Sequence, residues 1–363
     1  MKTTASYMRI FCCLAVLLFV ASVSTEMFAA SAKAEAPKAA AIAKSGVIKT
    51  EAMPAIRVTK PVDDTKRSAI YGHTPKGLRH ATKLGRVAPN TPAQHLIMML
   101  KSSPEQEREA RKVIDEQQDK RTANYHQWAT PEQFGQHFGV HDNDIAKVTA
   151  WMQSHGLKVE NVAKSKRAIQ FSGTSGQLEK AFQMEMHYYL MPNGETHVSN
   201  DRDISVPQAL RPVISGVPTL NDFFKKGHHT PPAKLSKLKP GPKYTDGSGN
   251  NFVGPADFAT IYNTAPLLSN GINGTGVTIG IAARSDILLS DVQTYRQMFN
   301  LPVNDPNFIN TGDDAGVVIG DDSETDLDTE ISGGVAPNAT VDVVIGTNNW
   351  LVDGITLSEM YLV

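Results

Sequence analysis

Apolar and polar residues alternate with a helical period in three segments between residues 103 and 156. The first two, "SSPEQEREARKVIDE" and "TPEQFGQHFG", each begin with a hydroxyl residue followed by proline, Ser103-Pro104 and Thr130-Pro131. A hydroxyl at the cap and proline at the first helical position are typical helix starts. The third, "HDNDIAKVTAWMQSHG", ends at Gly156, a residue type that often terminates helices. We predict a helix in each.

Segments typical of strands surround these helices. "TPAQHLIMML" precedes them, "LKVENV" and "RAIQFSG" follow, and "MHYYLMPNGETHVS" predicts a hairpin around Pro192-Asn193-Gly194. Short strands that pair locally, with helices between them, are typical of an antiparallel α+β domain. We place this domain at residues 92–223.

The pattern changes after residue 245. "GTGVTIGIAARS" is apolar between its glycine turns, as strands buried on both faces are, and "ATVDVVIG" predicts another such strand. "LSDVQTYRQMF" and "SETDLDTEISGG" predict helices, so residues 245–363 should form a parallel α/β sheet. The sequence ends inside a further predicted helix capped by Asp353, from which we expect an incomplete, protease-sensitive domain.

The N-terminus predicts export. Lys2 and Arg9 precede the apolar run "IFCCLAVLLFVASV", and small residues follow it, so residues 1–32 resemble a signal peptide and the protein is expected to be secreted, extracellular or periplasmic. A retained membrane anchor is the alternative. Cys12 and Cys13 both lie in this segment, so the mature chain would contain no disulfide and no cysteine ligand for a metal.

Two stretches are predicted to lie outside the folded domains. Residues 33–91 are rich in Ala, Lys and Pro and predict an extended lead-in. Residues 224–244 contain six lysines, four prolines and no acid before Tyr244, which indicates a solvated, protease-accessible linker. A basic patch for a membrane surface or nucleic acid is the alternative for this linker. The formal net charge of −1 favours no nucleic-acid partner, and we expect no stable membrane association.

The strongest candidate chemistry is a pair of carboxylates. Glu324 and Asp328 are four residues apart on a predicted helix that Ser323 could cap, so both side chains should project from one face. Two like charges that close disfavour double ionisation and raise one pKa, which suits a general base in acid. The simpler interpretation is that acids near a helix start only answer its dipole.

Other catalytic patterns fit less well. All eleven histidines lie between His73 and His229, which excludes a Ser-His-Asp triad within residues 245–363. The triplet Gly173-Thr174-Ser175 is of the type that carries a peptidase serine, but a predicted helix follows it directly. We interpret Ser175, or Thr174 beside it, as a helix cap. No metal ligand set is predicted.

The chain resembles the sedolisin family of serine-carboxyl peptidases. "YHQWATPEQFGQHFGV", "GLKVENVAKSKRAIQFSGTSGQLEKAF" and "YYLMPNGETHVSN" resemble a pro-kumamolisin-type activation domain, and "VGPADFATIYN" resembles the start of the mature enzyme. "ETDLD" and "GVAPNA" resemble the family's Glu-x-x-x-Asp helix and the segment after it. The resemblance implies a subtilisin-like α/β catalytic domain, protein or peptide substrates, and a prodomain that acts as an intramolecular inhibitor.

The family's residue roles, carried over by position, make Glu324 the general base for a serine nucleophile and Asp328 the residue that orients it. The family's nucleophile box Gly-Thr-Ser-x-x-x-Pro, oxyanion aspartate and calcium site belong to a later part of the family sequence that has no counterpart here. We therefore expect no cofactor in this chain. Our first hypothesis is an acid-acting endopeptidase precursor, truncated and inactive in this form; the second is an exported, non-enzymatic inhibitor or folding chaperone of an intact sedolisin.

Overall fold

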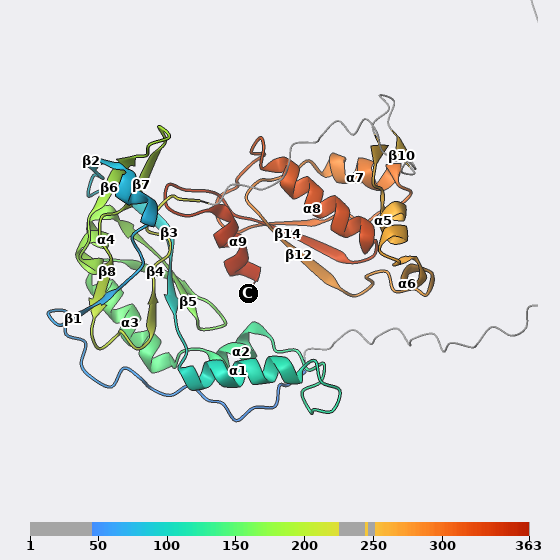
Figure 1. Cartoon of the computed structure of the whole chain (residues 1–363). Coiled ribbons are helices and arrows are strands. Elements are labelled where there is room, and N and C mark those ends of the chain that lie inside the picture. The colour runs from blue at the N-terminus through green and yellow to red at the C-terminus, as the bar shows by residue number, and fades with distance from the viewer. Residues whose placement is uncertain (1–45, 225–243, 246–250, 363) are drawn as a thin grey trace, which may run out of the picture. The chain divides into compact units, whose positions relative to one another are not determined.

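The structure is a computed structural model that describes residues 46–224, 244–245 and 251–362 (Figure 1). The predicted signal peptide and most of the predicted linker lie outside the described residues. Within the described ranges, no helix combines the length and apolar character needed to cross a membrane.

The N-terminal part is built from three antiparallel sheets. The largest has the strand order β4-β5-β3-β9, a second has the order β2-β6-β7, and β1 pairs with β8. The strands are β1 (Arg67–Ile70), β2 (Thr82–Arg86), β3 (Pro92–Leu100), β4 (Lys158–Val162), β5 (Ala168–Thr174), β6 (Met186–Leu190), β7 (Thr196–Asn200), β8 (Ile204–Pro207) and β9 (Ile214–Gly216).

The helices of this part begin where local sequence predicts. They are the 3-10 turn η1 (Lys76–His80) and the α-helices α1 (Pro104–Glu116), α2 (Pro131–Phe138), α3 (Asp142–Ser154) and α4 (Ser175–Phe182). The hydroxyls of Ser103 and Thr130 each accept a hydrogen bond from the backbone N–H of a glutamine three residues later. The side-chain oxygen of that glutamine accepts in turn from the backbone N–H of the capping residue, which completes a capping box. Helices α1 and α2 lie side by side (Figure 1).

A single apolar core joins α3 and α4 to the sheets. Phe171 of β5 and Phe182 of α4 are fully buried, and Trp151 of α3 meets Phe182 edge-on at a centroid distance of 5.8 Å. Ile145, Val148 and Met152 share the buried face of α3, as their spacing predicts.

Residues 46–91 differ from the predicted extended lead-in. β1 and β2 lie in this range and pair with strands more than a hundred residues later, and Ile48 and Val58 are buried. These strands are short, and β2 is exposed along its whole length, so they carry no apolar periodicity. Their pairing depends on distant partners, which local sequence does not reveal.

The C-terminal part contains the parallel sheet that the apolar strands predict. Its order is β12-β14-β13, with both pairs parallel. The elements are β10 (Tyr244–Thr245), β11 (Asn251–Phe252), α5 (Pro255–Ile261), α6 (Ala265–Ser269), β12 (Thr278–Ala283), α7 (Leu289–Met298), β13 (Asn307–Asn310), α8 (Asp322–Val335), β14 (Thr340–Ile345) and α9 (Gly354–Leu362). The predicted order of an antiparallel part followed by a parallel part is thus confirmed.

Helices α8 and α9 cover opposite faces of this sheet. Gly333 of α8 approaches Val341, which shares a buried cluster with Ile281. Leu362 of α9 lies against Gly280, the neighbour of Ile281, so it faces the other side. Both helices begin near the carboxyl ends of β12 and β14, the edge at which parallel α/β sheets place their sites.

Candidate active site

Helix α8 brings Glu324 and Asp328 to one cavity of about 480 Å³ at the end of the parallel sheet. The cavity is lined by residues that follow β9, by the end of β12, by the start of α8, and by residues before and within α9. They are Pro218, Thr219, Asn221, Phe223, Phe224, Ala282, Ala283, Arg284, Asp321, Glu324, Thr325, Asp328, Leu351, Asp353, Ile355, Thr356 and Glu359. The i, i+4 spacing does place the two carboxylates on a common wall. The predicted pair therefore faces a space that could admit a ligand.

Asp328 has a raised pKa. Burial, and then the charge of Glu324, raise the pKa of Asp328 above its ordinary value. A carboxyl that carries a proton can donate it in a hydrogen bond to a neighbouring carboxylate, and the raised pKa of Asp328 favours its protonated form. The arrangement is thus suited to sharing one proton between two acids.

The helix itself starts differently from the prediction. Ser323 is not the cap: the helix begins at Asp322, Asp321 precedes it, and the Ser323 hydroxyl donates to the carbonyl of Gly320. The Asp322 carboxylate accepts from the backbone N–H groups of Gly320 and Ser323 instead. Two consecutive acids, Asp321 and Asp322, therefore occupy the start of the helix, where negative charge is favourable, and Ser323 lies inside the first turn.

Arg284 ties together the starts of the two helices at this edge. Its guanidinium lies 2.8 Å from Asp321, which precedes α8, and 3.2 Å from Asp353, which precedes α9. The hydrogen bond to Asp321 is the first cause that raises the pKa of Arg284. Asp353 also accepts from the backbone N–H of Ile355, as its predicted capping role requires. Sequence reasoning did not single out Arg284, because its two partners are 37 and 69 residues away.

A second carboxyl pair on α8 was also missed. Asp326 and Glu330 have the same spacing as Glu324 and Asp328. Burial, followed by nearby acids that include Asp291 of α7, raises the pKa of Asp326 to about 6 and that of Glu330 to about 7. Neither residue lines the cavity. If the raised pKa were the only criterion, Asp326 and Glu330 would be the candidate catalytic pair. Glu324 and Asp328 are the better candidates because they line a cavity that a ligand could enter.

Two comparisons with known proteins found matches to this chain. Residues 79–223 match the family model "Pro-kumamolisin, activation domain". The chain is also 24% identical over 226 residues to kumamolisin of Bacillus sp. (strain MN-32), which covers 60% of this chain and 39% of that protein. Together these two similarities support a sedolisin-family precursor with a prodomain. It spans well under half the length of this relative.

The peptidase-like triplet lies within the activation domain and is structural. Thr174 caps α4: its hydroxyl accepts from the backbone N–H of Gln177, whose side chain accepts from the N–H of Thr174 in return. Ser175 is the first helical residue and is fully buried. Of the two hydroxyls offered by the sequence, the cap is therefore Thr174.

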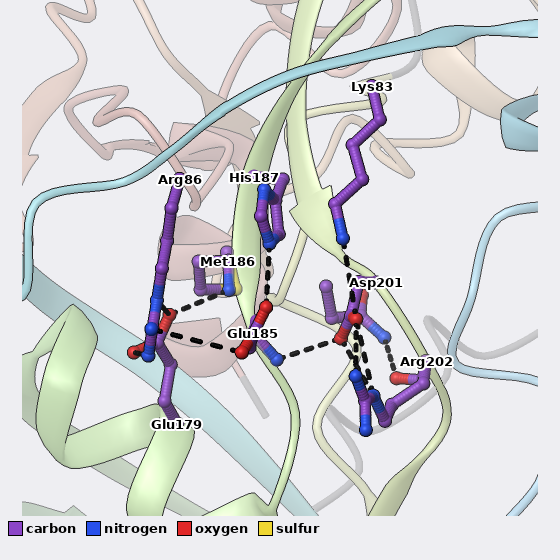
Figure 2. A network of polar contacts seen from close by, with 9 residues as sticks. Lys83, Arg86, Glu179, Glu185, Met186, His187, Asp201 and Arg202 are labelled. Atoms are coloured by element: carbon purple, nitrogen blue, oxygen red, sulfur yellow. Dashed lines mark hydrogen bonds and ion pairs between the residues drawn. The ribbon is translucent and has the colours of Figure 1, made fainter.

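The activation domain also contains the one group of potential metal ligands found among the described residues, Glu185, His187 and Asp201. Figure 2 shows that cations already surround it. Both oxygens of Asp201 accept from Arg202, and Arg86 lies 3.8 Å from Glu185 while it pairs with Glu179. Because these carboxylates already have charged partners, a metal ion would have to displace them. We assign no metal here.

Proposed function

We propose that this chain belongs to the precursor of a secreted, acid-acting serine-carboxyl endopeptidase, in which Glu324 is the general base and Asp328 orients it. The observation that carries the proposal is the placement of this pair on one wall of a cavity at the carboxyl edge of a parallel sheet. The kinship of the activation domain with pro-kumamolisin supports it. In this proposal residues 245–363 supply the first part of a subtilisin-like catalytic domain, and export depends on Lys2, Arg9 and the apolar run after them.

The proposed chemistry uses a carboxylate, in place of a histidine, as the base. In mild acid a histidine base would be protonated, whereas a carboxylate remains available to take a proton from a serine hydroxyl. Asp328, whose pKa is raised, would hold the shared proton and keep Glu324 in one orientation. The serine nucleophile and the oxyanion donor would come from the later part of the family sequence.

The activation domain would act as an intramolecular inhibitor. Five residues at its end line the same cavity as Glu324 and would compete with a protein substrate for that space: Pro218, Thr219, Asn221, Phe223 and Phe224. The lysine- and proline-rich stretch that follows, residues 225–243, has the composition of an accessible cleavage region.

The test is a comparison of variants in the protein expressed from its complete coding region and assayed with casein between pH 3 and pH 5. Glu324→Gln should lower kcat by about 100-fold or more, the contribution of a general base. Glu330→Gln, on the same helix but outside the cavity, is the matched control and should retain activity. Full activity of Glu324→Gln, or an absence of hydrolysis in every form, would contradict the proposal.

A further inference from the structure

The imidazole of His73 joins two backbone groups of the activation domain that are far apart in sequence. Its Nδ1 lies 3.1 Å from the carbonyl oxygen of Ile70, and its Nε2 lies 3.0 Å from the backbone nitrogen of Val217. The carbonyl can only accept, so Nδ1 carries the hydrogen. The Val217 N–H can only donate, so Nε2 must be unprotonated. The neutral ring satisfies both groups, whereas an imidazolium would set two N–H donors against each other.

Packing against Gly216 and hydrogen bonds to Asp203 fix the position of the ring. Gly216, the last residue of β9, lies directly beneath it: a Cβ at this position would be 2.0 Å from Nε2. The turn that carries His73 is fixed from the other side by Asp203. One oxygen of its carboxylate accepts from the backbone N–H groups of Gly72, His73 and Thr74, at 3.1, 2.9 and 3.1 Å. The contact between His73 and Val217 is thus placed by packing and is not an isolated surface bond.

Val217 begins the segment that leads to the candidate active site. The strand β9 ends one residue earlier, and Pro218, Thr219, Phe223 and Phe224 line the cavity that contains Glu324 and Asp328. Whatever holds the amide of Val217 also holds the start of this segment. Protonation of the His73 ring would remove the acceptor for the amide of Val217 and so weaken the attachment of residues 217–224.

We propose that His73 is an acid-sensitive clamp, which in its neutral form fixes the start of the segment 217–224 and releases it when the imidazole gains a proton. Its role in activating an enzyme rests on the proposed function, because only then does release of residues 217–224 uncover a working site. The clamp itself is a property of the activation domain and needs no peptidase activity.

The charges around the ring set the direction of the response. Desolvation by burial is the largest influence and lowers the pKa of His73, the nearby Asp203 raises it, and Arg211, which donates to the carbonyl of Ile214, lowers it. The net effect is a lowered pKa. An opened segment, with an exposed ring of pKa about 6.5, binds a proton more readily than the closed form. The closed form is therefore favoured at neutral pH and loses stability as the pH falls below about 6.5.

Hydrogen exchange at the amide of Val217 in the full chain tests the clamp. The protection factor, corrected for the intrinsic pH dependence of exchange, should fall by up to about tenfold per pH unit below the transition, as expected for uptake of one proton on opening. His73→Gln keeps one donor and one acceptor but cannot be protonated, so its protection should stay constant between pH 7 and pH 4.5. His80→Gln, which changes an exposed histidine at the end of η1, should behave like the unaltered protein.

Two outcomes would overturn the proposal: protection of Val217 that does not depend on pH in the unaltered protein, or a His73→Gln variant that loses protection to the same extent. If His73→Gln does not fold, the ¹⁵N resonances of the imidazole decide, because the clamp requires the hydrogen on Nδ1 at neutral pH. A hydrogen on Nε2 would refute it. A failed casein assay would refute the proposed function and leave these exchange results standing, so the two ideas can fail separately.

Discussion

Replacing Glu330 by glutamine should stabilise the protein at alkaline pH and have little effect in acid. Glu330 lies on α8 toward the acids Asp326 and Asp291, and burial followed by their charges raises its pKa from 4.5 to about 7. Between these two values the folded state binds more protons than the unfolded state. The contribution of Glu330 to the free energy of unfolding is therefore fully present below about pH 4.5 and is lost as the pH rises toward 7.

The size of the effect follows from this shift. A rise from 4.5 to about 7 is roughly 2.5 units, which corresponds to at most about 3 kcal/mol at 1.36 kcal/mol per unit. Glu330 is only partly buried, so solvent screens some of this cost, and we expect about 1–2 kcal/mol. Glutamine resembles the protonated acid and carries no charge, so Glu330→Gln should recover this amount at pH 8.

Urea denaturation of the full chain, followed by far-UV circular dichroism and by amide exchange of β12 and β14, measures the change. The free energy of unfolding of Glu330→Gln should exceed that of the unaltered protein at pH 8 and match it at pH 4.5. Glu359→Gln, which alters an exposed carboxyl of the same part, controls for the loss of one negative charge. An equal gain at both pH values, or none at pH 8, would show that burial of Glu330 does not set the pH dependence.

Three further changes test the activation domain by thermal unfolding. Thr174→Ala removes the cap of α4 and should cost about 1 kcal/mol, and an equal loss in Ser175→Ala would contradict the assignment of Thr174 as the cap. Phe182→Ala opens the core between Phe171 and Trp151 and should cost about 3–5 kcal/mol; a loss below 1 kcal/mol would mean that this core can collapse around the gap. Gly216→Ala should cost about 1–3 kcal/mol because its Cβ would clash with the ring above it, and unchanged exchange of Val217 in this variant would count against that packing.

The features that sequence predicts well depend on neighbours within a few residues. The caps at Ser103, Thr130 and Asp353 are bonds across two or three positions, so the residue types alone indicate them. A parallel sheet that contains β12 and β14 was also predicted, because largely apolar strands that alternate with helices are typical of such sheets.

Two sites could not be assigned from local sequence, because each offers two candidates with the same local pattern. Glu324 and Asp328 share their spacing with Asp326 and Glu330, so nothing in the pattern says which pair meets the cavity. Only the resemblance to sedolisins separated the pairs beforehand. The same ambiguity applied to Thr174 and Ser175, where one residue of difference in the helix start decides which hydroxyl is the cap.

The sequence by itself determined α1 to α4 and α7 to α9, the caps at Ser103, Thr130 and Asp353, the change from an antiparallel to a parallel part, and the i, i+4 carboxylates of α8. Only the tertiary structure decided that β1 and β2 join the activation domain, that Arg284 bridges two helix starts, and that His73 meets the amide of Val217. The local features depend on interactions within one helical turn or one strand, so the residue types at neighbouring positions are enough to indicate them. The others join groups 37 to 144 residues apart, and such contacts exist only after packing has brought distant segments together.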